Sequence, residues 1–228
     1  RYRDIFCLSD TATLIRNPVD QVVSHYQHLV RYYGHQGELM DFARQPKYQN
    51  VQSQFVGMLD PAFIGVVGPT EDYRSFLKIL NEQWHWSLSH RRRNVGNRLG
   101  IGRIRLTRKD RLEIKRLNAV DEGLYRRAKQ VFANRKKAHE SGICSDIRGG
   151  ITRAVVGRKL QGWALDMRSP APVTIDIVVN CEVIARTSCD LPLPEHSDWN
   201  LPGEGLAGFT ADTVALKEDS VVEIRDPD

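Results

Sequence analysis

The sequence of 228 residues has no long apolar run and few cysteines, and both absences narrow the class of protein. No stretch approaches the roughly 20 apolar residues that a membrane-spanning helix needs, so we expect no membrane span. The first residues contain no apolar core of a secretion signal. Because the chain does not begin with Met, the possibility of a leader that has been removed stays open. Together these absences predict a cytoplasmic protein.

Cysteine is too sparse, and too widely spaced, to form a recognisable metal site. The four cysteines make no C-x-x-C pair and have no zinc-ligand spacing with the seven histidines: Cys7, Cys144, Cys181 and Cys189. We therefore predict no metal, and we expect the reduced thiols of a cytosolic protein. Cys181 and Cys189 lie eight residues apart in strand-like sequence, so a close approach of these two stays open.

Basic residues outnumber acidic ones in the first part of the chain and are scarce in the last. Residues 1–145 carry 25 Lys and Arg against 14 Asp and Glu, a net charge of +11, whereas residues 146–228 carry a net charge of −6. A basic first part favours an anionic ligand such as a nucleotide or an acidic polysaccharide. The change of sign predicts two domains, one over residues 1–145 and one over residues 146–228.

The first part is organised around residues 11–33. A β-branched run that ends at Ile15 predicts a buried strand, and Asn17-Pro18 predicts a helix start, because Asn is a preferred N-cap and Pro is favoured at the first helical position. Arg16 then ends the strand, and Ser24 lies two turns into the helix. The apolar residues that follow have the spacing of one buried helical face: Val19, Val22, Val23, Tyr26, Val30 and Tyr33.

This strand, turn and helix would suit an anion. The start of a helix offers free backbone N–H groups and the positive end of the helix dipole. Arg16 can add a forked cation beside it, and the Ser24 hydroxyl can add one more hydrogen bond. The spacing alone leaves open the alternative, a surface ion pair for Arg16 and a solvated helix face for Ser24.

The identity of the residues narrows this choice. Leu14-Ile15-Arg16-Asn17-Pro18, followed by Ser24-His25-Tyr26, closely resembles the 3′-phosphate-binding segment of sulfotransferases that use 3′-phosphoadenosine 5′-phosphosulfate (PAPS). The resemblance is to the carbohydrate sulfotransferases, the group that includes the heparan sulfate 2-O-sulfotransferases. It implies that Arg16 and Ser24 hold the 3′-phosphate. It also implies an α/β fold with a P-loop-like parallel sheet, PAPS as the sulfuryl donor without a metal, and a carbohydrate or polysaccharide acceptor.

Two later stretches resemble the same family. Residues 50–57 resemble a segment near the acceptor side, where Gln52 or Gln54 either has a functional role or faces a neighbouring element. Residues 106–132 predict one long amphipathic helix that resembles the closing helix of the family, and a polar linker is expected over residues 133–150.

Between residues 57 and 106, the sequence predicts a second strand followed by a helix. An apolar run over residues 63–68 reads as a buried strand, and Thr70 as the start of the next helix, with Glu71 as a carboxylate of its first turn. This segment also resembles a strand and helix of the family. Two strands, each followed by a helix, predict a parallel α/β sheet.

Residues 89–105 are rich in arginine and glycine and have neither helical nor strand periodicity. They lack aromatic residues for base stacking, so we expect no nucleic-acid partner. The resemblance implies that this loop folds over the nucleotide, with Arg93 and Asn94 as further phosphate contacts. No catalytic base is predicted, since the histidines near these segments have ordinary structural explanations: His25, His28, His85 and His90.

The last part of the chain changes to the alternating pattern of β-strands, with turns every eight to twelve residues, which predicts a small all-β sandwich. Residues 160–166 and 205–209 resemble a bacterial β-module found beside sulfotransferase and glycosyltransferase domains, which implies a bacterial protein. Cys189 stands where that module commonly has Arg. A structural role and a glycan-contacting role are both open for this module.

Nothing before Arg16 resembles the family's Gly- and Lys-rich 5′-phosphosulfate loop, and its catalytic base would also precede residue 1. Either a further N-terminal part exists or the chain is a truncated, inactive remnant. We expect the former, because a parallel sheet without its central first strand would expose apolar edges. Two other functions stay open: a nucleotide-dependent phosphotransferase, and a non-catalytic glycan-binding or scaffolding protein. The acceptor and the oligomeric state are not predicted.

Overall fold

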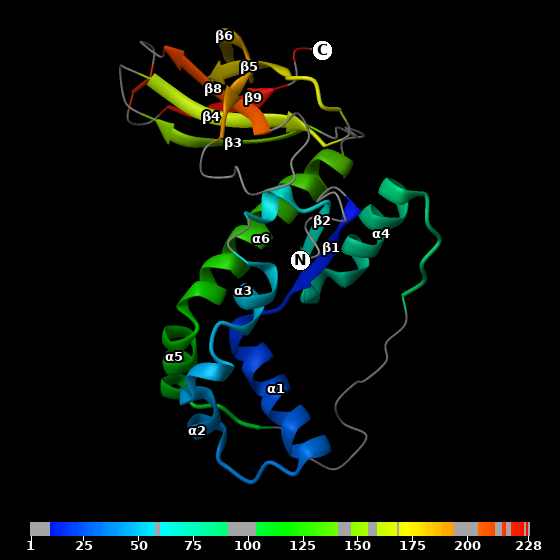
Figure 1. The fold of residues 1–228 in the computed structure, drawn as a ribbon, viewed down its shortest axis with the longest axis vertical. Helices are drawn as coiled ribbons and strands as arrows, with labels where there is room; N and C mark the ends of the chain where they lie inside the picture. The colour runs from blue at the N-terminus through cyan, green and yellow to red at the C-terminus, as the bar shows by residue number, and fades with distance from the viewer. Residues whose placement is uncertain are drawn as a thin grey trace. The chain divides into compact units, whose positions relative to one another are not determined.

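A computed structural model describes most of the chain, and it divides into two compact units (Figure 1). One unit is Ala12–Gly142, and the other is Ile143–Asp228 together with Arg1–Thr11. The predicted functional division, a sulfotransferase-like domain followed by an accessory module, remains a prediction. The described residues are 10–57, 60–90, 104–140, 147–154, 159–167, 169–193, 205–212, 216–217, 220–225 and 227.

The unit Ala12–Gly142 is a two-stranded parallel sheet with helices around it. In chain order its elements are β1 (Ala12–Ile15), α1 (Pro18–Tyr33), α2 (Leu39–Arg44), η2 (Pro46–Tyr48), α3 (Val51–Val56), η3 (Pro61–Phe63), β2 (Val66–Pro69), η4 (Thr70–Asp72), α4 (Tyr73–Trp84), α5 (Arg108–Leu117) and α6 (Ala119–Glu140). The elements labelled η are short 3₁₀ turns.

Strands β1 and β2 pair in parallel, with Ala12 opposite Val66 and Ile15 opposite Pro69. Helices α4 and α6 pack against β2 and bury apolar side chains such as Phe76 and Phe132 there (Figure 1). These observations confirm a mixed α/β fold with parallel strands. The finer prediction of a P-loop-like sulfotransferase core stays a prediction.

Helix α1 begins and ends as the sequence predicts. Asn17 is its N-cap and accepts a hydrogen bond from the Val19 N–H at 3.0 Å, and Gly34 ends it in the left-handed conformation (φ 66°). The predicted buried face is too long, however, because Tyr33 is 73% exposed. Helices α2 and α5 cover only part of α1, where they form one core cluster: Val19, Val22, Leu39, Phe42, Ala43 and Ile114.

The prediction of one long helix after residue 106 is wrong, because the chain breaks it at Asn118. Asn118 leaves the helical conformation (φ −116°, ψ 41°), and its side chain donates to the Ile114 carbonyl at 2.9 Å. The result is two helices, α5 and α6. The linker predicted from residue 133 is also wrong at its start, because α6 continues to Glu140.

The second predicted strand is displaced towards its C-terminal end. Strand β2 is Val66–Pro69, whereas Pro61–Phe63 forms a 3₁₀ turn because Asp60 caps it by accepting from the Ala62 N–H at 2.8 Å. The following α-helix starts at Tyr73, after the turn η4.

The other unit consists of antiparallel strands in two sheets. Its strands are β3 (Ile147–Ala154), β4 (Lys159–Asp166), β5 (Thr174–Val179), β6 (Glu182–Ser188), β7 (Leu191–Pro192), β8 (Leu206–Asp212) and β9 (Val222–Arg225). One sheet has the order β3-β4-β8-β7 and the other β6-β5-β9. A single core cluster contains residues of both sheets, among them Leu160 and Phe209 of the first and Ile175 and Ile177 of the second. Antiparallel sheets are therefore confirmed, and a sandwich stays a prediction.

The Gly-Trp and Gly-Phe phrases of this unit pair across strands β4 and β8. Gly162 lies opposite Phe209, and Trp163 lies opposite Gly208. A Cβ atom added to Gly162 would lie 2.5 Å from the Gly150 carbonyl oxygen and 2.7 Å from the Phe209 ring. Gly162 thus makes room for the Phe209 ring of the neighbouring strand, whereas a Cβ atom on Gly208 would meet Leu191.

A charged pair is partly enclosed between strands β5 and β6. Asp176, whose side chain is 9% exposed, accepts from Nε and Nη2 of Arg186 at 2.7 and 2.9 Å. Hydrogen bonds from Arg186 lower the pKa of this carboxyl. This bidentate pair of hydrogen bonds satisfies the carboxylate that the strand buries.

Cys181 and Cys189 carry free thiols, the first exposed and the second buried. Burial raises the pKa of the Cys189 thiol to about 11. The expectation of reduced thiols stays a prediction, and Cys7 and Cys144 lie outside the described residues.

Candidate active site

Strands β1 and β2 both lead into helices from the same edge of the sheet, because they are parallel. Arg16 and Asn17 follow β1, and Thr70 and Glu71 follow β2. In open α/β sheets, ligands bind at the carboxyl ends of the strands. This edge is therefore the candidate active site, and Arg16 is its cation.

The backbone of Arg16 is held on both sides by the side chain of Gln52. The Arg16 N–H donates to Oε1 of Gln52 at 2.8 Å, and Nε2 of Gln52 donates to the Arg16 carbonyl at 2.9 Å. We call this pair of bonds the Gln52 clamp. The half-buried guanidinium of Arg16 makes no hydrogen bond or ion pair with another residue in the described part of the chain. The clamp thus fixes the main chain and leaves the cation available to a ligand.

Asp121 of α6 in turn holds Gln52. Its carboxylate accepts from the N–H groups of Gln52 and Ser53, at 3.1 and 2.7 Å, and from the Ser53 hydroxyl. Asp121 is 1% exposed, so these bonds satisfy a charge that would otherwise be costly to bury. The first turn of α3 is therefore capped from a distant helix.

Asn50 and Asn118 complete the support. Asn50 adopts a left-handed conformation (φ 50°), and its N–H donates to Oδ1 of Asn118 at 2.8 Å. Oδ1 of Asn50 accepts from the N–H groups of Val120 and Asp121, at 3.1 and 3.2 Å. The side-chain oxygen of each asparagine thus accepts hydrogen bonds from backbone N–H groups at or beside the other asparagine. These bonds fix α3 against the junction of α5 and α6.

The start of α1 offers fewer free backbone donors than the sequence suggested. The Val19 N–H is already bonded to the side chain of Asn17, and Pro18 has no N–H. Asp20 adds an exposed carboxylate in the first turn. Attraction for an anion here therefore depends mainly on the Arg16 guanidinium and the helix dipole.

Glu71, at the end of β2, accepts a hydrogen bond from the hydroxyl of Tyr125. Tyr125 is 7% exposed, and its pKa is raised to about 12, first by burial and then by the bond with Glu71. Tyr125 therefore stays protonated as a donor at neutral pH. Its partner Glu71 is occupied as an acceptor. Glu71 lies in the turn η4, so the prediction that it stands in the first turn of the following helix is wrong.

Ser24 lines an open pocket of about 510 Å³ between α1, η2 and α3. Arg16 is not part of this lining, so the two residues predicted to share a phosphate lie on separate features of the surface. His25 and His28, for which no catalytic role is predicted, also line the pocket, whereas the predicted phosphate contacts Arg93 and Asn94 lie outside the described residues. The assignment of Arg16 and Ser24 to one phosphate stays a prediction.

None of the described helices has the length and apolar character that crossing a membrane requires. Nor do the His, Cys, Asp and Glu side chains of the described residues gather in a group that could hold a metal ion. Comparison of the chain with models of protein families, with curated proteins and with solved structures found no match.

Proposed function

We propose that the protein is a sulfotransferase that moves a sulfuryl group from PAPS to a hydroxyl of a carbohydrate or polysaccharide. The observation that carries the proposal is the Arg16 side chain, which is free of partners among the described residues while the Gln52 clamp holds its backbone. Such a fixed cation at the carboxyl end of a parallel strand suits the 3′-phosphate of the nucleotide. The unit of antiparallel strands would be its accessory β-sandwich module.

The reaction is an in-line displacement at sulfur. The acceptor hydroxyl oxygen forms the new S–O bond, the bond from sulfur to the 5′-phosphate oxygen breaks, and adenosine 3′,5′-bisphosphate leaves with the electron pair. A base takes the hydroxyl proton. Positioning and stabilisation of charge supply most of the rate in such transfers. In this chain Arg16 would contribute by binding and orienting the nucleotide.

Substitution of Arg16 and Ser24 in the natural full-length protein tests the proposal by calorimetry. A charge-assisted hydrogen bond is worth about 1.5–3 kcal/mol, so Arg16→Ala should weaken binding of adenosine 3′,5′-bisphosphate about 10- to 150-fold. A neutral hydroxyl bond is worth about 0.5–1.5 kcal/mol, so Ser24→Ala should weaken it about 2- to 10-fold. Transfer of radiolabelled sulfate from PAPS to a polysaccharide should fall in parallel.

Two controls make the result specific. Arg74→Ala removes an exposed arginine of α4 and should leave the affinity unchanged. Adenosine 5′-phosphate lacks the 3′-phosphate, so its weaker binding should change little in either variant. Equal loss of affinity for both nucleotides would show that Arg16 and Ser24 do not recognise the 3′-phosphate, and the sulfotransferase proposal would lose its main support.

A further inference from the structure

The pocket beside Ser24 has the residues of a binding site for a polar, negatively charged ligand. Lys47 is its cation, and none of the described lining residues is an Asp or Glu. The side chain of Gln21 lines it and makes no hydrogen bond with another described residue, so it is available to ligand hydroxyl groups. Its volume of about 510 Å³ is in the range of small-molecule sites.

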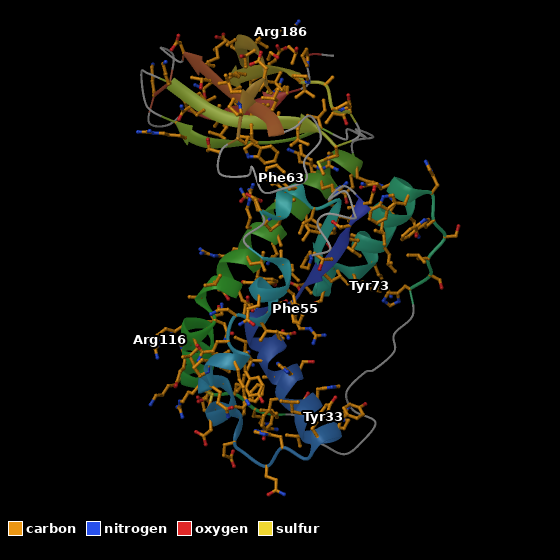
Figure 2. The ribbon with its side chains drawn as sticks, in the orientation of Figure 1. Tyr33, Phe55, Phe63, Tyr73, Arg116 and Arg186 are labelled. Carbon is orange, nitrogen blue, oxygen red and sulfur yellow. The ribbon has the colours of Figure 1, made fainter. Side chains whose placement is uncertain are left out.

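One aromatic ring of the pocket has no role in the fold. Phe55 is 88% exposed, the highest value among the large apolar side chains of the described residues. It lies on α3 beside the beginning of α1, whereas Tyr33 lies at the other end of that helix (Figure 2). A flat apolar face at the rim of a polar pocket suits the C–H face of a sugar ring, whose hydroxyl groups can then reach the polar lining.

The second aromatic ring of the pocket is already occupied. Tyr48 stacks on Phe42 with ring centroids 4.0 Å apart, and the Lys47 ammonium lies 4.7 Å from the centre of the Tyr48 ring. The edge of His25 contacts the same ring at 5.3 Å. Of the Phe and Tyr rings in the described lining, only Phe55 is unoccupied, so a planar base would not be enclosed between two such rings, which favours a sugar over a nucleotide base.

His25 adds a neutral hydrogen-bonding group. Burial and the neighbouring His28 lower its pKa, so the imidazole is uncharged at neutral pH and offers one donor and one acceptor. The permanent positive charge of the lining lies at Lys47, which is exposed on η2. A ligand with hydroxyl groups and one carboxylate or sulfate per sugar matches this distribution.

We infer that this pocket binds an acidic sugar unit, a uronate or sulfated residue, of the polysaccharide acceptor. That the bound sugar belongs to the acceptor rests on the proposed function, whereas the preference of the pocket for an acidic sugar can be tested without it. Phe55 would contact the face of the sugar ring. The side-chain amides and the imidazole would form hydrogen bonds with its hydroxyl groups, and Lys47 would pair with its negative charge.

Two oligosaccharides of the same length test the inference by calorimetry on the natural full-length protein. Hyaluronan tetrasaccharide carries glucuronate units, and chitotetraose is its neutral counterpart. We expect the acidic probe to bind about 2- to 10-fold more tightly, in line with the weak interaction of an exposed ion pair. Lys47→Ala should remove this preference, whereas Phe55→Ala should weaken both probes about 2- to 10-fold.

Matched variants provide the controls. Lys78→Ala removes an exposed lysine of α4, and Trp86→Ala removes an exposed ring just after α4 that is not part of the pocket lining, so neither should change binding. Phe55→Tyr keeps the ring and should retain affinity. Circular dichroism checks that each variant is folded.

The nucleotide separates this inference from the proposed function. Affinity for adenosine 3′,5′-bisphosphate should be unchanged in the Phe55 and Lys47 variants and reduced in Arg16→Ala. If those two variants lose the nucleotide instead, the pocket belongs to the nucleotide and the inference is overturned. Absence of tetrasaccharide binding at millimolar concentration, or equal binding of both probes, overturns it too. If the nucleotide does not bind but the acidic preference depends on Lys47, the proposed function fails and the acidic-sugar site stands.

Discussion

The Gln52 clamp predicts that a residue without contact to the ligand governs nucleotide affinity. Gln52→Met keeps the length of the side chain and removes both hydrogen bonds to Arg16, at 2.8 and 2.9 Å. Each bond is worth about 0.5–1.5 kcal/mol net. Because both backbone groups are only partly buried and can regain water, we expect the free energy of unfolding to fall by about 1–2 kcal/mol.

The effect on affinity follows from the freedom that Arg16 gains. Fixing the backbone of one residue costs about 1–2 kcal/mol in conformational entropy, and in the variant this cost would arise on binding. Such a cost corresponds to about a 5- to 30-fold weaker affinity for adenosine 3′,5′-bisphosphate. Adenosine 5′-phosphate should be much less affected, because its binding does not use Arg16 in the proposed arrangement.

Calorimetry with both nucleotides and urea unfolding of the same samples measure the two effects. Gln130→Met is the matched control, because Gln130 is exposed on α6 and its side chain makes, among the described residues, a single 3.4 Å bond, which it accepts from Arg127. A variant at Gln52 that is less stable but binds the nucleotide with unchanged affinity would refute the reasoning, since the clamp would then support the fold and not the site.

Three further predictions concern the antiparallel unit and α6. Gly162→Ala should lower the free energy of unfolding by about 1–3 kcal/mol through overpacking, whereas Gly123→Ala, which has open space in α6, should raise it by about 0.5–1 kcal/mol; the same sign in both would contradict this. Arg186→Ala should lower the melting temperature at pH 7. This loss should shrink as the pH falls from 3.8, the ordinary pKa of Asp, through the lowered pKa of Asp176, because the protonated carboxyl no longer pairs with Arg186. A loss that does not change with pH would count against the pair. Maleimide should modify Cys189 much faster in guanidinium than in the folded protein at pH 8, and equal rates would disprove its burial.

Local sequence signals predicted the elements well wherever one residue sets a chain conformation. Asn17-Pro18 defined the start of α1, and Gly34 ends it. Alternating apolar residues predicted β-strands for the last part of the chain, although Asp176 is buried within one of them because Arg186 reaches it from the next strand. Such a partner cannot be identified from local periodicity.

The support of the candidate site could not be predicted in the same way. Asn118 and Asp121 fit the pattern of an amphipathic helix, and nothing local indicates that Asn118 breaks it or that Asp121 caps α3. Both effects depend on residues about 70 positions earlier, chiefly Asn50 and Gln52. The one available signal is chemical: asparagine and aspartate on the inner face of a helix need polar partners.

The connectivity of the Gln52 clamp has a consequence for the order of folding. Arg16 and Gln52 are 36 residues apart, and Gln52 depends on Asp121, which is 69 residues further along the chain. Contacts that close such long loops form late, because the chain loses the entropy of loop closure before the contacts contribute any stabilisation. Helix α1, whose hydrogen bonds are local, can therefore form before Arg16 is held. Hydrogen exchange at the Arg16 amide would then report the docking of α6, and synthesis must pass Asp121 before the site acquires its geometry.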